Sequence, residues 1–192
     1  MPEPDKTRIH AFEDSAAFCR WLELNHVSEP EVWVKIFKNG SGQKTIGWNE
    51  AVVEALCWGW IDGLKKPLDD QAYLQRFTPR QKGSNWSKRN REHVERLIAE
   101  GRMQESGMAH VRAAQADGRW DAAYAPASEM TVPEDFLAAL EQRPAAKAFF
   151  ETLNRQNLYA IAYRLQTARK PETRQKRFER FLAMLEKGEK LY

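Results

Sequence analysis

Cysteine and long apolar segments are what this sequence has least of. Its 192 residues contain two cysteines, Cys19 and Cys57, too few for a disulfide framework and outside any metal-ligand spacing. The longest apolar run covers residues 55–61, whereas a membrane helix needs about 20 residues. The first ten residues lack the apolar core of a secretory signal. We therefore expect no bound metal, no membrane span and a location in the reducing cytoplasm.

Net charge is also small, but it is unevenly distributed. The 30 basic and 27 acidic residues give a net charge of +3, which does not by itself indicate a nucleic-acid-binding protein. Residues 76–91 nevertheless contain six cations and no acid. The balance is −4 over residues 1–75 and over 92–163, and it is +5 over 164–192. The acid-free segment therefore predicts a local positive surface.

Alanine and leucine dominate the composition and favour helix. They supply 39 residues, against 14 for valine and isoleucine. We expect an α+β fold with a small, mainly antiparallel sheet of about three strands, near residues 32–38, 59–66 and 72–78. Helices over 14–25 and 49–57 are expected to cover one face of this sheet. The C-terminal half is expected to be all-helical.

The change to helical composition predicts a division of the chain near residue 85. Residues 1–85 form the sheet-containing α/β part, and residues 86–192 form the helical part. A chain of this length could equally fold as one cooperative domain. The segment Pro67-Leu-Asp-Asp70 predicts the turn that joins the last two strands into a hairpin.

Asp62 is the candidate catalytic group. If a strand begins near Trp58, then Trp58, Trp60 and Asp62 share one face of it. A carboxylate beside indole rings can have a raised pKa, which suits a general acid or base. The alternative is that both tryptophans pack in the core and Asp62 binds backbone in a turn. We favour that alternative, because aromatic residues are core residues more often than site residues.

The acid-free basic segment is the candidate ligand-binding site. A helix is predicted to begin at Ser87, and the free N–H groups of its first turn favour an anion. Lys88 and Arg89 in that turn are unfavourable for the helix itself, and a bound anion would relieve the conflict. The favoured alternative is a solvated basic loop that pairs with acids of the chain. The predicted ligand-binding residues are Trp60, Arg76, Arg80, Lys82, Trp86, Ser87, Lys88 and Arg89.

Other binding chemistries have weaker support. Phe77 and Trp86 among cations could stack the bases of a single strand, but the small net charge and the lack of a nucleic-acid-binding motif favour a small anion instead. The segment Gly40-Ser-Gly42 lacks the spacing of a phosphate-binding loop, and no cofactor is expected. The four histidines are scattered along the chain and predict no metal centre.

Three motifs and a later segment resemble a known family. The motifs are Glu54-Ala-Leu-Cys-Trp-Gly-Trp-Ile-Asp-Gly63, Tyr73-Leu-Gln-Arg-Phe-Thr-Pro-Arg80 and Trp86-Ser-Lys88. The later segment is Ala160-Ile-Ala-Tyr-Arg-Leu-Gln-Thr-Ala168 with Pro171-Glu-Thr-Arg174. Over roughly residues 18–185 the chain resembles the bacterial YdeI/OmpD-associated, or bacteriocin-protection, family. The resemblance implies a link to envelope stress and to resistance against bacteriocins or cationic peptides, and it carries over no catalytic residue.

Three functions are open at this point. The first is a cytoplasmic, stress-linked binding protein whose basic cleft accepts an anionic small molecule or an acidic protein surface. The second is an enzyme that uses Asp62 in an aromatic pocket on a phosphorylated or acidic substrate. The third is a protein-interaction module without chemistry. The directions of Arg76, Arg80 and Lys88 relative to Asp62 discriminate among them.

Overall fold

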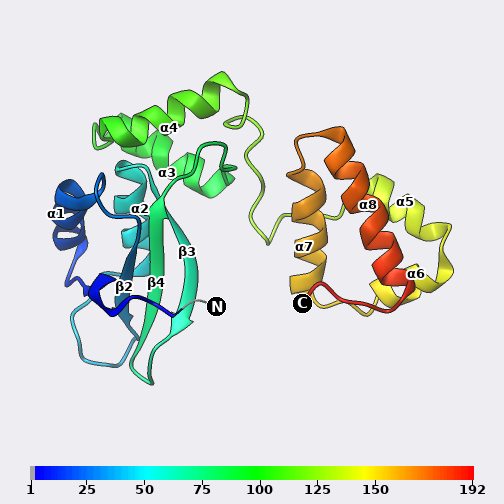
Figure 1. Ribbon diagram of the computed structural model, residues 1–192, viewed down its shortest axis with the longest axis horizontal. Coiled ribbons are helices and arrows are strands. Elements are labelled where there is room, and N and C mark those ends of the chain that lie inside the picture. Colours follow the sequence, from blue (N-terminus) through cyan, green and yellow to red (C-terminus); the bar gives the residue numbers. More distant parts are fainter. Residues whose placement is uncertain (1–2) are drawn as a thin grey trace. The chain divides into compact units, whose positions relative to one another are not determined.

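A mixed four-stranded sheet organises the first of two units in the chain (Figure 1). The computed structural model describes residues 3–192. Unit 1 contains the residues up to Trp86 together with Asn90–Ala122, and unit 2 contains Ser87–Arg89 together with Ala123–Tyr192. The fold is α+β, as the sequence predicts.

The strands of the sheet follow the order β1-β2-β4-β3. β4 (Ala72–Pro79) pairs antiparallel with both β2 (Val32–Phe37) and β3 (Trp60–Pro67), which confirms the three predicted strands. The prediction of about three strands missed β1 (Ile9–Ala11), which follows the 3-10 helix Lys6–Arg8 and pairs parallel with β2. A strand of three residues is too short to carry an alternating pattern, so the tertiary pairing alone reveals it.

Aromatic side chains attach α1 (Ser15–Asn25) to the sheet. Phe18 of this helix packs on Phe77 of β4, with 5.5 Å between ring centres. Trp21, one helical turn later, meets Trp60 of β3 edge-on at 5.8 Å. Because the apolar residues of α1 recur at helical spacing, they face the same side of the sheet, as the sequence predicts.

Three further helices complete unit 1: α2 (Trp48–Cys57), α4 (Glu105–Ala116) and α3 (Lys88–Ala99), of which Lys88 and Arg89 belong to unit 2. α4 approaches the end of α2 closely because Gly107 has no side chain, and a Cβ at this position would collide with the Cys57 carbonyl oxygen. The division near residue 85 is predicted from the change in composition. In the structure, residues Asn90–Ala122 pack with the sheet and belong to unit 1. Burial of the apolar residues Val94 and Val111 on α3 and α4 accounts for this difference.

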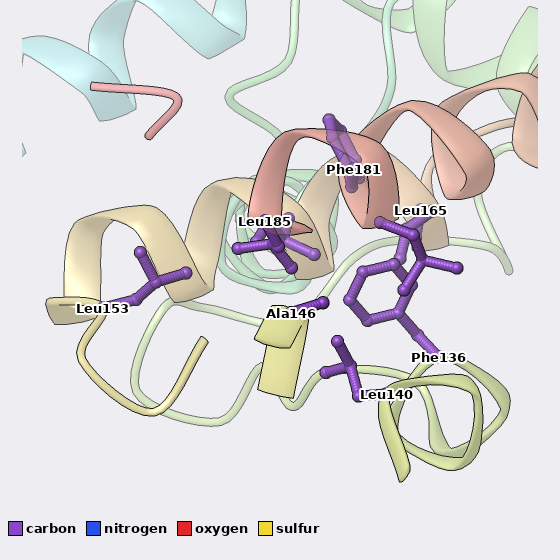
Figure 2. Packing of buried hydrophobic residues seen from close by; sticks show 9 residues of the cluster. Phe136, Leu140, Ala146, Leu153, Leu165, Phe181 and Leu185 are labelled. Atoms are coloured by element: carbon purple, nitrogen blue, oxygen red, sulfur yellow. The ribbon is translucent and has the colours of Figure 1, made fainter. Parts of the chain in front are cut away.

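Unit 2 is built around an apolar core (Figure 2). Its helices are α5 (Glu134–Glu141), α6 (Pro144–Phe150), α7 (Arg155–Gln166) and α8 (Pro171–Glu186). Phe136, Leu165 and Phe181 belong to this core and are at most 2% exposed. The helical character predicted for the C-terminal half is thus confirmed. One isolated β-bridge, between Ser87 and Tyr124, adds to the helices.

Replacing Phe136 by alanine tests whether the two units unfold separately. The substitution leaves a cavity in unit 2, and we expect it to lower the free energy of unfolding by about 3–5 kcal/mol. All seven tryptophans belong to unit 1, so tryptophan fluorescence during urea unfolding reports on that unit alone. We expect Phe136→Ala to shift the circular-dichroism transition and to leave the fluorescence transition in place.

The matched control is Leu137→Ala, because this neighbouring side chain is 39% exposed. It should change the free energy of unfolding by less than about 1 kcal/mol. An equal shift of both signals in Phe136→Ala would indicate one cooperative unit.

Candidate functional site

An irregularity in the β3–β4 pairing brings two charged side chains to the same face of the sheet. Asp62 lies opposite Phe77 and Lys65 lies opposite Gln75, so three steps along β3 match two steps along β4. The extra residue in β3 is a β-bulge. In a regular strand, residues three positions apart point to opposite faces. Without the bulge, Asp62 and Lys65 would therefore lie on opposite faces of the sheet. The bulge therefore determines which side chains share this face.

A cavity of about 330 Å³ opens on this face, and we call it the Asp62 pocket. Trp48 from the first turn of α2 lines it together with Asp62, Lys65, Tyr73 and Gln75 from the hairpin. The Trp48 Nε1 donates to Asp62 Oδ2 at 3.3 Å, and the Lys65 ammonium lies 3.9 Å from the centre of the Tyr73 ring. A carboxylate, an ammonium and two aromatic rings thus surround one hollow.

The side chain of Gln75 holds the bulge in place. Gln75 is 3% exposed, and its Nε2 donates to the Gly63 carbonyl oxygen at 3.0 Å and lies 3.4 Å from the Leu64 carbonyl oxygen. These two residues make up the irregular part of the strand pairing, and carbonyl groups without a strand partner need another donor. Burial raises the pKa of the neighbouring Tyr73 phenol, so this group stays protonated at neutral pH.

The sequence pointed to Asp62 but not to its neighbours in the pocket. Trp60, the predicted aromatic wall, is 1% exposed, and its Nε1 donates to the His26 carbonyl oxygen within the core. A strand that began near Trp58 would have placed this residue on the face of Asp62, but Trp58 caps α2, and Gly59 with a φ of +76° turns the chain before β3 begins. The available signal for the pocket was Gly63, because a glycine inside a strand often marks a bulge.

The predicted basic cleft is divided among separate environments. Arg76 lies on the opposite face of the sheet from Asp62, and its Nε is 2.6 Å from Oε2 of Glu31. Arg80 is 3% exposed, and its guanidinium lies 3.7 Å from the centre of the Trp86 ring, which is itself buried. A carboxylate and an indole of the chain itself therefore contact these two cations.

The other predicted ligand-binding residues lie at the surface of unit 1 or in unit 2. Lys82 is exposed in a turn of unit 1. Ser87, Lys88 and Arg89 belong to unit 2, where the Lys88 N–H donates to the Tyr124 carbonyl oxygen at 2.9 Å. Of the predicted ligand-binding residues, Arg80 and Trp86 lie in contact with each other.

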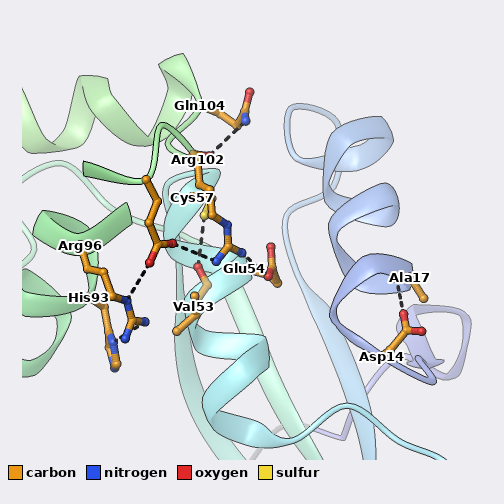
Figure 3. Close-up of polar contacts among 10 residues, drawn as sticks. Asp14, Ala17, Val53, Glu54, Cys57, His93, Arg96, Arg102 and Gln104 are labelled. Atoms are coloured by element: carbon orange, nitrogen blue, oxygen red, sulfur yellow. Dashed lines mark hydrogen bonds and ion pairs between the residues drawn. The ribbon is translucent and has the colours of Figure 1, made fainter. Parts of the chain in front are cut away.

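A second cavity, of about 410 Å³, is lined by residues of α1 and α2, including both cysteines. Figure 3 shows an ion pair on its wall, in which Nη2 of Arg102 lies 2.5 Å from Oε1 of Glu54. Burial, and next the negative charge of Glu54, raise the pKa of the Cys57 thiol to about 12. Cys57 is therefore protonated and inert at neutral pH, which agrees with its apolar surroundings in the sequence.

His110 on α4 is a further group with a perturbed pKa. Burial lowers the pKa of His110, and the positive charges of Arg80 and Arg119 lower it further. Arg119 is 9% exposed, and its Nε lies 2.7 and 2.8 Å from the carboxylate oxygens of Asp117. Within residues 3–192, no group of three or more His, Cys, Asp or Glu side chains is placed to hold a metal ion. No helix of this described part has the length and apolar character needed to cross a membrane.

Two family models match the chain, one in each unit. The model described as Domain of unknown function (DUF8412) matches residues 10–110, more than half of the chain. The chain belongs to this family. The model described as Bacteriocin-protection, YdeI or OmpD-Associated matches residues 129–188 and confirms the family resemblance inferred from the sequence. No curated protein and no solved structure matches the chain.

The two matches divide the motifs on which the resemblance was based. The DUF8412 match contains residues 54–63 and 73–80, and with them the whole Asp62 pocket. The bacteriocin-protection match contains residues 160–168 and covers α5 to α8 of unit 2. The first two motifs therefore lie within the DUF8412 region, and the C-terminal segment lies within the bacteriocin-protection region.

The perturbed pKa of His110 makes the stability of this DUF8412 protein depend on pH. Because the pKa is lower in the folded than in the unfolded chain, its contribution is fully present above the unfolded value near 6.5. It is lost as the pH falls below that value towards the folded pKa. We expect the difference in free energy of unfolding between pH 7.5 and pH 5.5 to be smaller in His110→Gln than in the unchanged protein, as measured by urea titration. An unchanged difference would contradict the lowered pKa.

The thiol of Cys57 should react only after unfolding. With a disulfide reagent at pH 8, we expect Cys19, which is partly exposed, to react in the folded protein, and Cys57 to react once urea is added. Cys57→Ala should leave the thiol count of the folded protein unchanged and should reduce that of the unfolded protein. Rapid labelling of Cys57 in the folded protein, identified by mass spectrometry, would disprove this.

Proposed function

We propose that this bacteriocin-protection-type protein binds a small molecule with an acidic group in the Asp62 pocket. The observation that carries the proposal is the bulge in β3, which places Asp62 and Lys65 on one face of the sheet beside Trp48 and Tyr73. β-bulges are frequent next to functional sites, where they redirect a side chain. A few charged groups within an aromatic hollow are typical of small-molecule sites.

Lys65 is the group that would bind the acidic end of the ligand. Its side chain is exposed, and within residues 3–192 no carboxylate lies at ion-pair distance from its ammonium. The Tyr73 ring holds this ammonium by a cation–π contact, which limits its motion before a ligand arrives. A carboxylate or phosphate can therefore pair with Lys65 without breaking an existing ion pair.

Asp62 would bind a donor on the same ligand. Its Oδ2 accepts the hydrogen bond from Trp48, and a carboxylate has the capacity to accept further ones. A ligand that carries an amino or hydroxyl group beside its acidic group matches this pair of opposite charges. Amino acids, hydroxy acids and their phosphorylated forms are the chemical class that we propose.

An enzymatic role for the same pocket is the alternative. Asp62 would act as the general base, and the Tyr73 phenol, whose pKa burial raises further above neutral pH, would donate a proton or a hydrogen bond. Lys65 would orient the acidic part of the substrate. Turnover of any bound ligand that is abolished by Asp62→Asn would support this role.

A second proposal concerns the exposed cations of the basic segment. α3 begins at Lys88 without an acidic residue in its first turn, and the Lys88 side chain is exposed in unit 2. An acidic protein surface or an anionic small molecule would bind there. The two cysteines are free thiols, which suits the cytoplasm that we propose as the site of action.

Titration calorimetry with amino acids, small hydroxy acids and their phosphate esters tests the first proposal. We expect binding to the full chain that weakens about 10- to 100-fold in Lys65→Gln and in Asp62→Asn, since each loses a charged hydrogen bond. The matched control is Lys35→Gln. The Lys35 ammonium lies 4.7 Å from the centre of the Phe37 ring, on the opposite face of the sheet, and this variant should bind normally.

Three outcomes decide between the proposals. If no compound of the panel binds, or if binding persists in both Lys65→Gln and Asp62→Asn, the pocket is not the site. Binding that Lys88→Gln abolishes and Lys65→Gln does not would favour the basic segment. Heat from product formation, confirmed by chromatography, would establish the enzyme.

A further inference from the structure

A third cavity, of about 350 Å³, lies where β1 and the end of α1 meet the segment before β2. It belongs to unit 1 and shares no lining residue with the Asp62 pocket. Six of its lining residues carry the argument, namely Thr7, Arg8, Trp21, Asn25, Glu29 and Glu31. We call it the Arg8 cavity.

The charges around the Arg8 cavity balance. Arg8 Nε lies 3.6 Å from Glu29 Oε2, and Arg8 Nη1 lies 4.0 Å from Glu31 Oε1. Glu31 is paired on its other side with Arg76 at 2.6 Å. Arg76 does not line the cavity but neutralises Glu31. Arg8 and Glu29 then remain as one cation and one carboxylate, without surplus charge to attract an ion.

Several polar groups of the cavity, in contrast, make few hydrogen bonds to other described residues of the chain. The two contacts of Arg8 are longer than the 2.7–2.9 Å of a charge-assisted hydrogen bond. Within residues 3–192, the side chains of Arg8 and Glu29 make no contact short enough for a hydrogen bond, since their own separation is 3.6 Å. Asn25 donates from its Nδ2 to the Trp21 carbonyl oxygen, which leaves its Oδ1 as an acceptor. The Thr7 hydroxyl donates to Asp5 and retains its acceptor capacity.

A rigid aromatic surface forms part of the wall. Trp21 is half-buried and is fixed by Trp60, which it meets edge-on at 5.8 Å, and by Phe18, on which it stacks at 6.3 Å. The His10 ring of β1 also contacts Trp21, with 5.7 Å between ring centres and a tilted geometry. An indole held in this way can cover the apolar side of a flat ring ligand at little entropic cost.

We infer that the Arg8 cavity binds a neutral polyhydroxylated ligand of the size of a monosaccharide. A hydroxyl group donates and accepts at once, so hydroxyls placed between Arg8 and Glu29 would satisfy the donor of one and the acceptor of the other. A row of adjacent hydroxyls extends this match to Asn25 and Thr7. The C–H face of a sugar ring would lie on Trp21, and the balanced charges disfavour an ionic ligand.

Saturation-transfer difference NMR and tryptophan fluorescence on the full chain test this inference. The probes are glucose, galactose, mannose and N-acetylglucosamine, with glycerol at equal osmolality as the blank. We expect saturable binding of at least one sugar whose affinity changes less than about twofold between low and high salt, because neutral ligands are not screened. Arg8→Gln and Asn25→Ala should each weaken this binding about tenfold.

Arg20→Gln is the matched control, since Arg20 is an exposed arginine of α1 that does not line the cavity. It should leave sugar binding unchanged, and circular dichroism should show that all three variants are folded. Lys65→Gln should also leave it unchanged, which separates this inference from the proposed function.

The opposite results would overturn the inference. If no neutral sugar binds, or if only glucuronate or glucosamine binds and does so with strong salt dependence, the cavity is not a polyol site. Sugar binding that survives Arg8→Gln and Asn25→Ala but disappears in Lys65→Gln would assign the sugar to the Asp62 pocket.

Discussion

The hydrogen bonds from the buried amide of Gln75 to the bulge carbonyls hold the hairpin in the register on which the Asp62 pocket depends. One extra residue in β3 reverses the alternation of side chains for the rest of that strand. Lys65 consequently shares a face with Asp62 and meets Tyr73, its cation–π partner. The proposed function therefore rests on backbone pairing as much as on side-chain chemistry.

Local neutralisation determines which cations of unit 1 are available to a ligand. Arg76 is held by Glu31, and Arg80 is buried against Trp86. The sequence predicts Arg76 and Arg80 as ligand-binding residues but not Lys65, because a charge count does not register burial or pairing. Lys65 instead keeps an exposed ammonium on an aromatic ring, an arrangement that leaves its charge accessible to an anion.

The two family matches fall on units with different interiors. The DUF8412 region contains the Asp62 pocket and nearly all of the sheet, and Thr7 and Arg8 of the Arg8 cavity lie just before its first matched residue. The bacteriocin-protection region covers helices whose described core is apolar, with Phe136 and Phe181 buried within it (Figure 2). The polar cavities described above thus belong to unit 1, and a binding role for this protein is best sought there.

The sequence by itself determined the elements whose pattern is local. The strand over residues 32–37, the turn between Pro67 and Ala72 and the helix over residues 15–25 each follow from a few neighbouring residues. It also indicated Asp62, because a carboxylate within an aromatic segment is unusual. Tertiary structure alone decided that β1 pairs with β2, that Lys65 shares a face of the sheet with Asp62, and that Arg80 is buried. These outcomes depend on strand register and on packing between distant segments, and the order of residues along one segment does not encode them.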